Sequence, residues 1–346
     1  MAEKMKGIVF VGPQKVEIQE FDKPKIRANE VLLKMRTVAL CTMEQRTFRG
    51  TGGKYPSVSG HEVCAEIVEV GEDVFGYEVG DRVVSTFSYC GYCENCKKGE
   101  GSKCVNTRLQ RKRAHSDTVT IGNSGMIQYA AVPATQICKV GENVPDELAC
   151  LSEPLACCLH SVSKTRVDYG DTCVVIGAGI MGLLHTKLFR MRGARVIMSE
   201  MDPERRAKAE ANGAICIDPS SCDAVQAVMD LTDGKGADVV VNTTSIYQVG
   251  EQAIQMLAPL GRLIAYASLH PAVPLPIDLG QVHYKEIEII GTVSPRQRDF
   301  VNATKLMKYE LIDMTDVLGY VFPMEEAQKA FEQAITPGTY RVVIKY

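Results

Sequence analysis

The sequence carries almost no net charge, contains no long hydrophobic run and shows no internal repeat. Its 39 lysines and arginines stand against 42 aspartates and glutamates, a formal charge of −3. A balance this close argues against broad attraction to nucleic acid or to a membrane surface, so we expect neither as a partner. No apolar run reaches the length of a membrane span, and the first residues lack the hydrophobic stretch of a secretory signal.

Cysteine is abundant, but its number and spacing argue against a disulfide framework. The 13 cysteines are odd in number and several of them bunch together, which favours metal ligands and reduced thiols. We therefore expect a cytoplasmic enzyme. The length of 346 residues suggests two domains of ordinary size, each able to bury a core.

The nucleotide-binding pattern of this sequence lies in residues 173–206. An apolar run over 173–176 predicts a buried parallel strand, and Gly177, Gly179 and Gly182 follow in the order G-x-G-x-x-G at the start of a helical run. In such a turn the first glycine makes the bend, the second lets the backbone approach a pyrophosphate, and the third lets helix and strand pack closely. The helix N-terminus supplies N–H groups for the phosphates. A glycine turn in another doubly wound fold is the plainer alternative.

An acidic residue after the next strand indicates which dinucleotide binds. Glu200 follows the apolar strand over 195–198, where a carboxylate can accept hydrogen bonds from the hydroxyls of the adenine ribose. Because a carboxylate there would repel a 2′-phosphate, the sequence predicts NAD rather than NADP. Arg205 and Arg206 lie close enough in the sequence to weaken this preference.

The remaining pattern divides the chain into two kinds of structure. Residues 5–40 and 57–84 alternate short strands with Gly, Pro and Asp turns, which favours a small antiparallel barrel or sandwich. After about residue 158, strands alternate with helices, which predicts an α/β domain with a doubly wound parallel sheet. From about residue 291 the pattern changes again, and a closing strand over 340–345 would return to complete the first domain.

Four cysteines in one short segment form the strongest single motif. Cys90, Cys93 and Cys96 are followed by Cys104. Spacings this short let one loop wrap a metal tetrahedrally, and four thiolates close the coordination sphere, which predicts a structural zinc. An iron–sulfur cluster, or a site that has lost its metal, are the alternatives. The basic segment that follows, residues 107–117, is either a solvated loop or a positive rim that favours anionic substrates.

Three distant stretches could supply a second metal site. Cys41 and His61 are good zinc ligands by type, Glu62 adjoins His61, and Glu153 begins a helix. Each also has an ordinary explanation. A buried cysteine often acts as a small hydrophobe, a histidine can satisfy a turn, and a glutamate at a helix start offsets the helix dipole.

Taken together, these motifs resemble the zinc-dependent medium-chain dehydrogenases, which include alcohol, polyol (sorbitol-type) and threonine dehydrogenases. The resemblance runs from about residue 5 to the C-terminus and is carried by Cys41, GHE at 60–62, GDRV at 80–83, the four-cysteine segment, EP at 153–154 and GAGIMG at 177–182. It implies a GroES-like β-rich catalytic domain over 1–157 and 292–346, with a structural zinc lobe at 88–106. A Rossmann domain over 158–291 would bind NAD, with the active site in the cleft between the two domains.

The resemblance also assigns roles to residues. Cys41, His61 and either Glu62 or Glu153 would hold a catalytic zinc, and the choice of glutamate stays open. EP at 153–154, where alcohol-type members carry a cysteine, favours the polyol branch. The dinucleotide would contact residues of the glycine turn, the acidic position and two later segments: Gly177, Gly179, Ile180, Met181, Gly182, Glu200, Arg205, Leu269, Val293 and Ser294. Because relatives pair subunits through the strand at 287–291, a homodimer or homotetramer is expected.

We therefore predict a dehydrogenase that transfers hydride from a secondary alcohol to NAD, the alcohol being a polyol, a sugar derivative or a cyclitol. Zinc would lower the pKa of the bound alcohol, and the Rossmann domain would hold the nicotinamide that accepts the hydride. A threonine or simple-alcohol dehydrogenase is the alternative among enzymes. A non-catalytic dinucleotide-binding protein of the same fold is the alternative from another class.

One departure from the family affects the proton relay. Relatives commonly carry Ser or Thr two residues after the zinc cysteine and His five residues after it, where this chain has Met43 and Arg46. Methionine has no proton to pass on and arginine stays charged. We expect the proton to leave through water or through Glu44, Glu62 or Glu153.

The arginine at this position also bears on the substrate. Arg46, together with the basic loop at 108–113 and with Arg296 and Arg298 of a later segment, would favour hydroxyl-rich or acidic substrates. The alternative is that Arg46 contacts the ribose or the phosphates of the cofactor and that the other basic residues are solvated.

Overall fold

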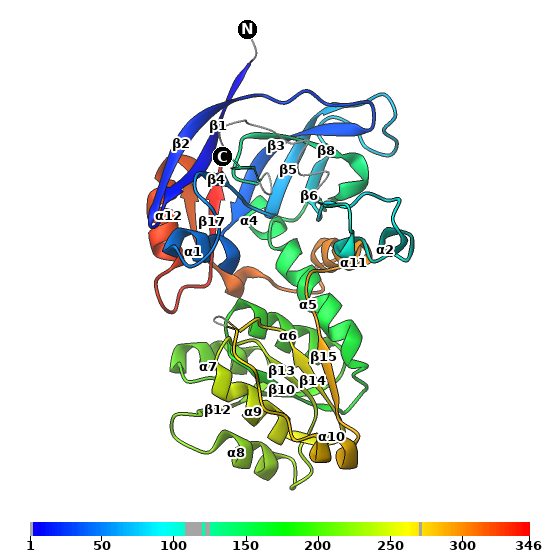
Figure 1. Cartoon of the computed structure of the whole chain (residues 1–346), viewed down its shortest axis with the longest axis vertical. Helices are drawn as coiled ribbons and strands as arrows, with labels where there is room; N and C mark the ends of the chain where they lie inside the picture. The colour runs from blue at the N-terminus through cyan, green and yellow to red at the C-terminus, as the bar shows by residue number, and fades with distance from the viewer. Residues whose placement is uncertain (1–2, 108–119, 122–124, 270–271) are drawn as a thin grey trace. The chain divides into compact units, whose positions relative to one another are not determined.

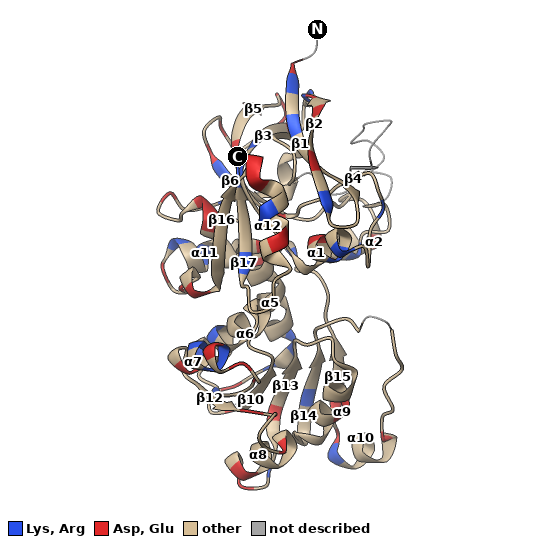
Figure 2. Cartoon of the chain, turned by 90° about the vertical axis from the view of Figure 1, so that its left-hand side faces the viewer, with Lys and Arg blue, Asp and Glu red and all other residues tan. Residues whose placement is uncertain are grey.

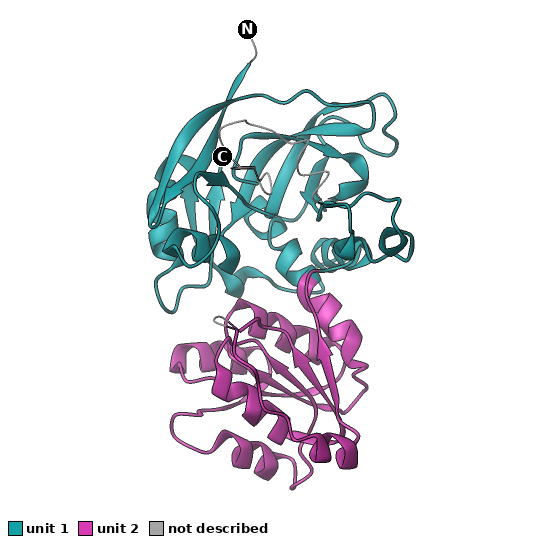
Figure 3. Ribbon diagram, viewed as in Figure 1, with its two compact units in different colours: residues 1–156, 295–346 teal, residues 157–294 magenta. Residues whose placement is uncertain are grey.

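The computed structural model describes residues 3–107, 120–121, 125–269 and 272–346, and the chain divides into two compact units (Figures 1 and 3). Unit 1 consists of residues 1–156 and 295–346, and unit 2 of residues 157–294. The expected domain boundaries were 157/158 and 291/292. Among the described residues, no helix has the length and apolar character needed to cross a membrane.

Unit 1 is built on two β-sheets. One has the strand order β2-β1-β4-β7, and the other has the order β16-β17-β3-β5-β6-β9, with β8 also paired to β3. The strands are β1 (Lys4–Gly12), β2 (Lys15–Asp22), β3 (Glu30–Ala39), β4 (Ser57–Val58), β5 (Glu62–Val70), β6 (Arg82–Ser85), β7 (Thr120–Ile121), β8 (Tyr129–Pro133), β9 (Ile137–Lys139), β16 (Leu318–Pro323) and β17 (Arg341–Lys345). The helices are α1 (Thr42–Arg49), α2 (Glu94–Lys97), α4 (Asp146–Ala149), α11 (Gln297–Lys308) and α12 (Ala327–Ala334), together with the first turn of α5 (Ser152–Thr165).

The two ends of the chain meet in the core of unit 1. Strand β17 pairs antiparallel with β3, with Ile344 opposite Val38, so the last residues complete a sheet begun by the first forty. Phe331 of α12 packs edge-on against Phe10 at 5.0 Å and stacks on Phe48 at 5.1 Å between ring centroids. All three rings are fully buried, and this packing fixes α1 against the sheet.

Unit 2 is a parallel sheet covered by helices. Its strand order is β12-β11-β10-β13-β14-β15, and every neighbouring pair is parallel. Numbered along the chain from β10, this is the order 3-2-1-4-5-6 of the doubly wound dinucleotide-binding fold. The strands are β10 (Thr172–Ile176), β11 (Arg195–Ser199), β12 (Ala214–Ile217), β13 (Ala237–Asn242), β14 (Leu257–Ala265) and β15 (Glu288–Gly291). The helices are α6 (Ile180–Met191), α7 (Pro203–Ala211), α8 (Ala224–Leu231), α9 (Tyr247–Gln255) and α10 (Leu279–Lys285), with the remainder of α5.

The central strands of this sheet are apolar throughout because helices cover both faces. Val174, Ile197 and Val240 are fully buried and belong to one hydrophobic cluster. The predicted α/β class with a doubly wound parallel sheet is confirmed.

Candidate metal and nucleotide sites

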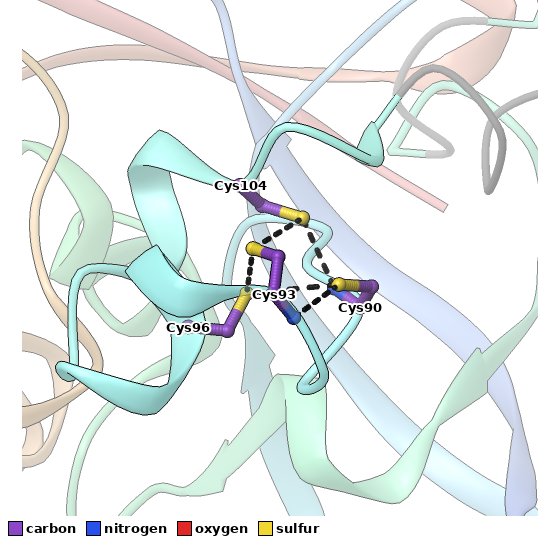
Figure 4. A group of neighbouring side chains, drawn as sticks. All are labelled: Cys90, Cys93, Cys96 and Cys104. Carbon is purple, nitrogen blue, oxygen red and sulfur yellow. Dashed lines mark hydrogen bonds between the residues drawn. The ribbon is translucent and has the colours of Figure 1, made fainter.

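The four cysteines of the predicted zinc lobe come together in one loop of unit 1 (Figure 4). Their sulfur atoms all lie within 4.8 Å of one another, with Cys93–Cys96 at 3.4 Å, Cys90–Cys96 at 3.9 Å and Cys93–Cys104 at 4.0 Å. Because a zinc–sulfur bond is about 2.3 Å long, sulfurs at the corners of a tetrahedron around zinc lie about 3.8 Å apart. The spacing of these thiols therefore fits a closed tetrahedral metal site.

Hydrogen bonds to the sulfur of Cys90 favour its thiolate form. The backbone N–H of Cys93, the side-chain amide of Asn106 and the backbone N–H of Tyr92 donate to this sulfur, each at 3.4 Å. Together they lower the pKa of the Cys90 thiol to about 6. A thiolate is the form that binds a metal.

A second group of metal-binding side chains forms where β3 meets β5. Cys41 follows β3 and precedes α1, while Glu62 is the first residue of β5 and His61 directly precedes it. Strands β3 and β5 pair antiparallel, with Ala39 opposite Glu62, so the end of one strand lies beside the start of the other. One ligand atom from each of Cys41, His61 and Glu62 lies within 4.8 Å of the other two.

Glu44 of α1 contacts the Nδ1 side of the His61 ring. Its Oε1 accepts from Ser59 Oγ at 2.7 Å and from the Gly60 N–H at 3.2 Å, and it lies 3.1 Å from His61 Nδ1. This contact leaves Nε2 as the nitrogen free to bind a metal, the arrangement in which a carboxylate orients a ligating histidine. Burial alone would lower the pKa of His61, but the negative charges of Glu44 and Cys41 raise it well above its usual value.

Arg341 of β17 approaches Glu62 from the other side. Its Nη2 lies 2.9 Å from Glu62 Oε1, both side chains are buried, and its Nη1 donates to the Leu40 carbonyl at 3.1 Å. Burial raises the pKa of Glu62 to about 7, although the charge of Arg341 acts in the opposite direction. Glu62 Oε1 is thus paired with Arg341, whereas Glu62 Oε2 is buried without a hydrogen-bond partner among the described residues. Buried carboxylate oxygens beside a thiol and an imidazole are the donor set that zinc prefers.

Glu153, the other predicted ligand, lies in the first turn of α5 and outside the group of three. It is near enough for its negative charge to raise the pKa of Glu62 and that of Arg341. Arg341 is the charged residue of this site that sequence reasoning missed. An arginine directly before the three apolar residues of the closing strand, RVVIK, was the signal that could have pointed to it.

The glycine turn of unit 2 has the geometry that its sequence predicts. Gly177 ends β10 with a φ of 93°, a conformation that L side chains rarely adopt. A Cβ on Gly182 would lie 1.8 Å from the Gly177 carbonyl oxygen, so only glycine allows α6 to pack this closely on the strand. Gly179 is the N-cap of α6, and a Cβ there would meet no atom within 4 Å. The space beside Gly179 is open to a phosphate group at the helix N-terminus.

Glu200 lies directly beside this turn. Its carboxylate accepts from the backbone N–H of Ala178 at 2.7 Å and from that of Asp202 at 2.9 Å. Arg206 is turned toward the backbone, since its guanidinium donates to the carbonyls of Glu200 and Met201 and lies 3.1 Å from Asp218. Arg205 shares helix α7 with acidic and basic neighbours (Figure 2).

The other predicted cofactor residues follow the carboxyl ends of unit 2 strands or begin α6. Ile180 and Met181 form the first turn of α6 and are half-buried, as is Leu269 after β14. Val293 is 66 % exposed after β15, and Ser294 has a φ of 57°. Because the strands are parallel, their carboxyl ends share the sheet edge at which doubly wound folds bind ligands.

The two predicted substrate arginines have different surroundings. Arg296 caps α11, and its Nη2 lies 2.8 Å from Glu100 Oε1 in the cysteine lobe. Arg46 is half-buried on α1, and its guanidinium makes no hydrogen bond or ion pair with any residue that the structure describes. Of the basic segment 107–117, all but residue 107 lies outside the described residues.

Comparison with known proteins gives two family matches. Residues 27–142 match the alcohol dehydrogenase GroES-like domain, and residues 181–309 match the zinc-binding dehydrogenase domain. The chain is 29 % identical to a sorbitol dehydrogenase from Halalkalibacterium halodurans, covering 91 % of each protein, and 32 % identical to an L-threonine 3-dehydrogenase from Pyrococcus furiosus, covering 99 % of each. The crystal structure of 2R,3R-butanediol dehydrogenase from Bacillus subtilis superimposes with a TM-score of 0.86 at 25 % identity, covering 99 % of both chains. These matches confirm the predicted resemblance.

Proposed function

Because the chain belongs to the zinc-dependent medium-chain alcohol dehydrogenase family, we propose that it oxidises a polyol or a related secondary alcohol with NAD, using one catalytic and one structural zinc. The observation that carries this proposal is the convergence of Cys41, His61 and Glu62 within 4.8 Å, with Glu62 Oε2 buried and without a hydrogen-bond partner among the described residues. Zinc bound there would supply a Lewis acid that lowers the pKa of an alcohol oxygen.

The residues of unit 1 would prepare this chemistry in different ways. Cys41 and His61 would hold the metal with Glu62 or Glu153 as the third protein ligand. Glu44 would keep His61 in the tautomer that presents Nε2. Arg341 would balance the charge of whichever carboxylate is not on the metal, since its own charge interacts with both glutamates.

The residues of unit 2 would bind the dinucleotide. Gly177, Gly179 and Gly182 would leave room for the pyrophosphate at the start of α6, and Glu200 would accept from the adenine ribose. A carboxylate held beside the glycine turn supports NAD over NADP. Arg206 would not weaken this preference, because its guanidinium is engaged by two backbone carbonyls and by Asp218.

Arg46 bears on the substrate class. A half-buried guanidinium without a described partner, on the helix that follows Cys41, would favour a substrate with a carboxylate, a phosphate or many hydroxyls. Arg46→Ala should raise the KM for sugar acids or polyol phosphates more than that for NAD. Arg49→Ala is the matched control, because the Arg49 guanidinium on the same helix donates to the Ile335 carbonyl. A selective loss of NAD affinity in Arg46→Ala would instead assign Arg46 to the cofactor.

The decisive experiment combines metal analysis with a substrate panel. The purified protein should contain two zinc ions per chain and should form NADH with at least one member of a panel of D-sorbitol, D-arabitol, erythritol, a cyclitol and a sugar acid. NADP should be the poorer oxidant. A single zinc and no turnover with any alcohol would overturn the proposal in favour of a non-catalytic dinucleotide-binding protein.

L-Threonine belongs in the same panel as the second candidate substrate. The Pyrococcus furiosus relative named L-threonine 3-dehydrogenase is the more similar of the two relatives by identity and spans 99 % of this chain. A kcat/KM for L-threonine at least about tenfold above that of every polyol, a difference of about 1.4 kcal/mol, would replace the polyol assignment.

We also propose a homodimer or homotetramer in the cytoplasm. Strand β15 is an edge strand of its sheet, and Ile289 on it is 41 % exposed, features that a second copy of the chain could cover. The 13 cysteines are all free, which supports a reducing compartment. Light scattering coupled to size-exclusion chromatography measures the assembly directly.

A further inference from the structure

A buried histidine behind the glycine turn takes no part in the proposed chemistry. His185 lies in α6 and is fully buried. Its Nδ1 lies 2.7 Å from the carbonyl oxygen of Met181, and its Nε2 lies 2.8 Å from Ser161 Oγ on α5. Both ring nitrogens are therefore engaged, one within α6 and one across to α5.

These partners determine how the ring is protonated. A carbonyl oxygen can only accept a hydrogen bond, so Nδ1 carries the proton. Burial lowers the pKa of His185 to about 4, which keeps the ring neutral and leaves Nε2 as an acceptor for the Ser161 hydroxyl. The ring thus forms one directed chain of hydrogen bonds from Ser161 through His185 to Met181.

The same ring also supports the segment that follows β14. Tyr266 packs edge-on against His185 with 4.7 Å between ring centroids, and its hydroxyl lies 3.9 Å from Cys158 Sγ. That thiol in turn lies 3.7 Å from the Met181 carbonyl oxygen. Cys158, Ser161, Met181, His185 and Tyr266, here named the His185 cluster, thus join α5, the first turn of α6 and the end of β14.

The first turn of α6 is the part of the nucleotide site that this cluster can influence. Met181 and Gly182 supply the carbonyls that receive His185 Nδ1 and, at 3.0 Å, Thr186 Oγ1. Two successive side chains therefore donate to carbonyls four residues earlier, a pattern that bends a helix locally. The direction of the N–H groups offered at the helix N-terminus depends on how that turn is held.

We infer that His185 is a positioning residue for the dinucleotide, which holds the first turn of α6 and the 266–269 segment in register with each other. The inference rests on dinucleotide binding by unit 2, as proposed above. His185 touches neither the cofactor nor the substrate, and its effect passes through the Met181 carbonyl and the Tyr266 ring.

Substitutions of His185 can test the contributions of the two ring nitrogens separately. Asparagine presents its amide N–H near the position of Nδ1 and keeps the bond to Met181, whereas glutamine presents its polar group near Nε2 and keeps only the contact with Ser161. Leucine keeps neither contact. We expect the Kd for NADH to rise about tenfold in His185→Leu and His185→Gln, equivalent to losing the hydrogen bond to Met181 of about 1.4 kcal/mol, and to rise only about threefold in His185→Asn, which keeps that bond but loses the ring that packs on Tyr266.

Direct binding of NADH and of ADP-ribose by isothermal titration calorimetry measures these effects in the full chain. Tyr266→Phe, which keeps the ring that packs on His185 and removes only the hydroxyl, should leave the Kd for both NADH and ADP-ribose within about twofold of wild type. Thr232→Val is the matched control, because Thr232 Oγ1 also donates to a carbonyl four residues earlier, that of Val228 at 2.7 Å, at the other end of the sheet. Steady-state kinetics should show a higher KM for NAD with little change in kcat.

The outcomes separate this inference from the proposed function. Wild-type protein that binds neither NADH nor ADP-ribose would overturn the proposed function, and the inference with it. If wild type binds NADH and the leucine, glutamine and asparagine variants all bind it with the wild-type affinity, the inference alone would be overturned. If His185→Leu does not fold, Ser161→Ala and the comparison of His185→Asn with His185→Gln test the inference instead. The specific result is tighter NADH binding by His185→Asn than by His185→Gln.

Discussion

His61 and His185 differ in the chemistry of the groups that contact their ring nitrogens. His61 faces the carboxylate of Glu44, which raises its pKa and leaves its second nitrogen available. His185 faces a carbonyl and a hydroxyl, which occupy both nitrogens of a ring whose pKa burial lowers to about 4. A carboxylate partner thus prepares an imidazole to bind a cation, whereas two neutral partners make it a rigid link between helices.

The largest effect should come from removing the imidazole that binds the cation. His61→Ala should lower kcat/KM at least about a thousandfold, about 4 kcal/mol of transition-state stabilisation, and reduce the zinc content from two ions to one per chain. His185→Asn should keep both ions and the wild-type kcat. Zinc analysis by mass spectrometry and kinetics with saturating NAD measure the two quantities. Equal loss of zinc in both variants would remove the distinction between the histidines.

The pH dependence of stability should be the next largest effect, and it belongs to His185. In the unfolded chain histidine titrates near pH 6.5, but in the folded chain His185 titrates near 4. Between these pH values His185 is protonated in the unfolded state and neutral in the folded state. The free energy of unfolding therefore falls as the pH is lowered. The loss attributable to His185 between pH 7 and pH 4 should be about 3 kcal/mol.

The measurement is a difference between two proteins. Denaturant unfolding of the full chain at several pH values, in wild type and in His185→Asn, should give free energies of unfolding that diverge below pH 6.5, with wild type losing more. Phe189→Leu, one turn further along α6, should lower stability without changing this slope, since no titrating group is removed. If the free energy of unfolding depended on pH in the same way in wild type and in His185→Asn, His185 would be protonated in the folded state as readily as in the unfolded state.

The same contrast explains which parts of the molecule could be predicted from the sequence. The four cysteines of the zinc lobe and the glycines of the nucleotide turn lie within short segments, so their spacing alone fixes most of their geometry. The hydrophobic pattern likewise predicted the parallel sheet and the return of the last strand to the first domain.

Contacts that depend on strand register or helix packing could not be predicted in this way. Arg341 reaches Glu62 because β17 pairs with β3 and β3 pairs with β5, and no local pattern encodes both registers. The role of Glu44 as the partner of His61 depends on how α1 packs against the segment that precedes β5, so the sequence could name this glutamate only as one of three proton carriers. His185 was hidden for the same reason, since its partner Ser161 lies on another helix.

A smaller effect should follow from neutralising the partner of His61. Glu44→Gln keeps the size of the side chain but removes its charge. A residue that hydrogen-bonds to a metal-bound histidine typically contributes about 10- to 100-fold to metal affinity or activity. We expect a loss of that size in zinc affinity, measured by competition with a chelator. Glu66→Gln is the control, because Glu66 of β5 pairs with Arg36 rather than with a predicted ligand. Unchanged zinc affinity in Glu44→Gln would mean that the carboxylate does not act through His61.

The smallest effect should come from Ser59, which contacts His61 only through Glu44, whereas Ser161 contacts His185 directly. Ser59→Ala removes one of the donors to Glu44 Oε1 but leaves the Gly60 N–H and His61 in place, so zinc affinity should fall only about fivefold, near 1 kcal/mol. Ser161→Ala should leave zinc affinity unchanged. Because Ser59 acts only through the carboxylate, Ser59→Ala should cause no further loss in a Glu44→Ala background. Additive losses in that double variant would place Ser59 in direct support of the metal ligands, as Ser161 directly supports His185.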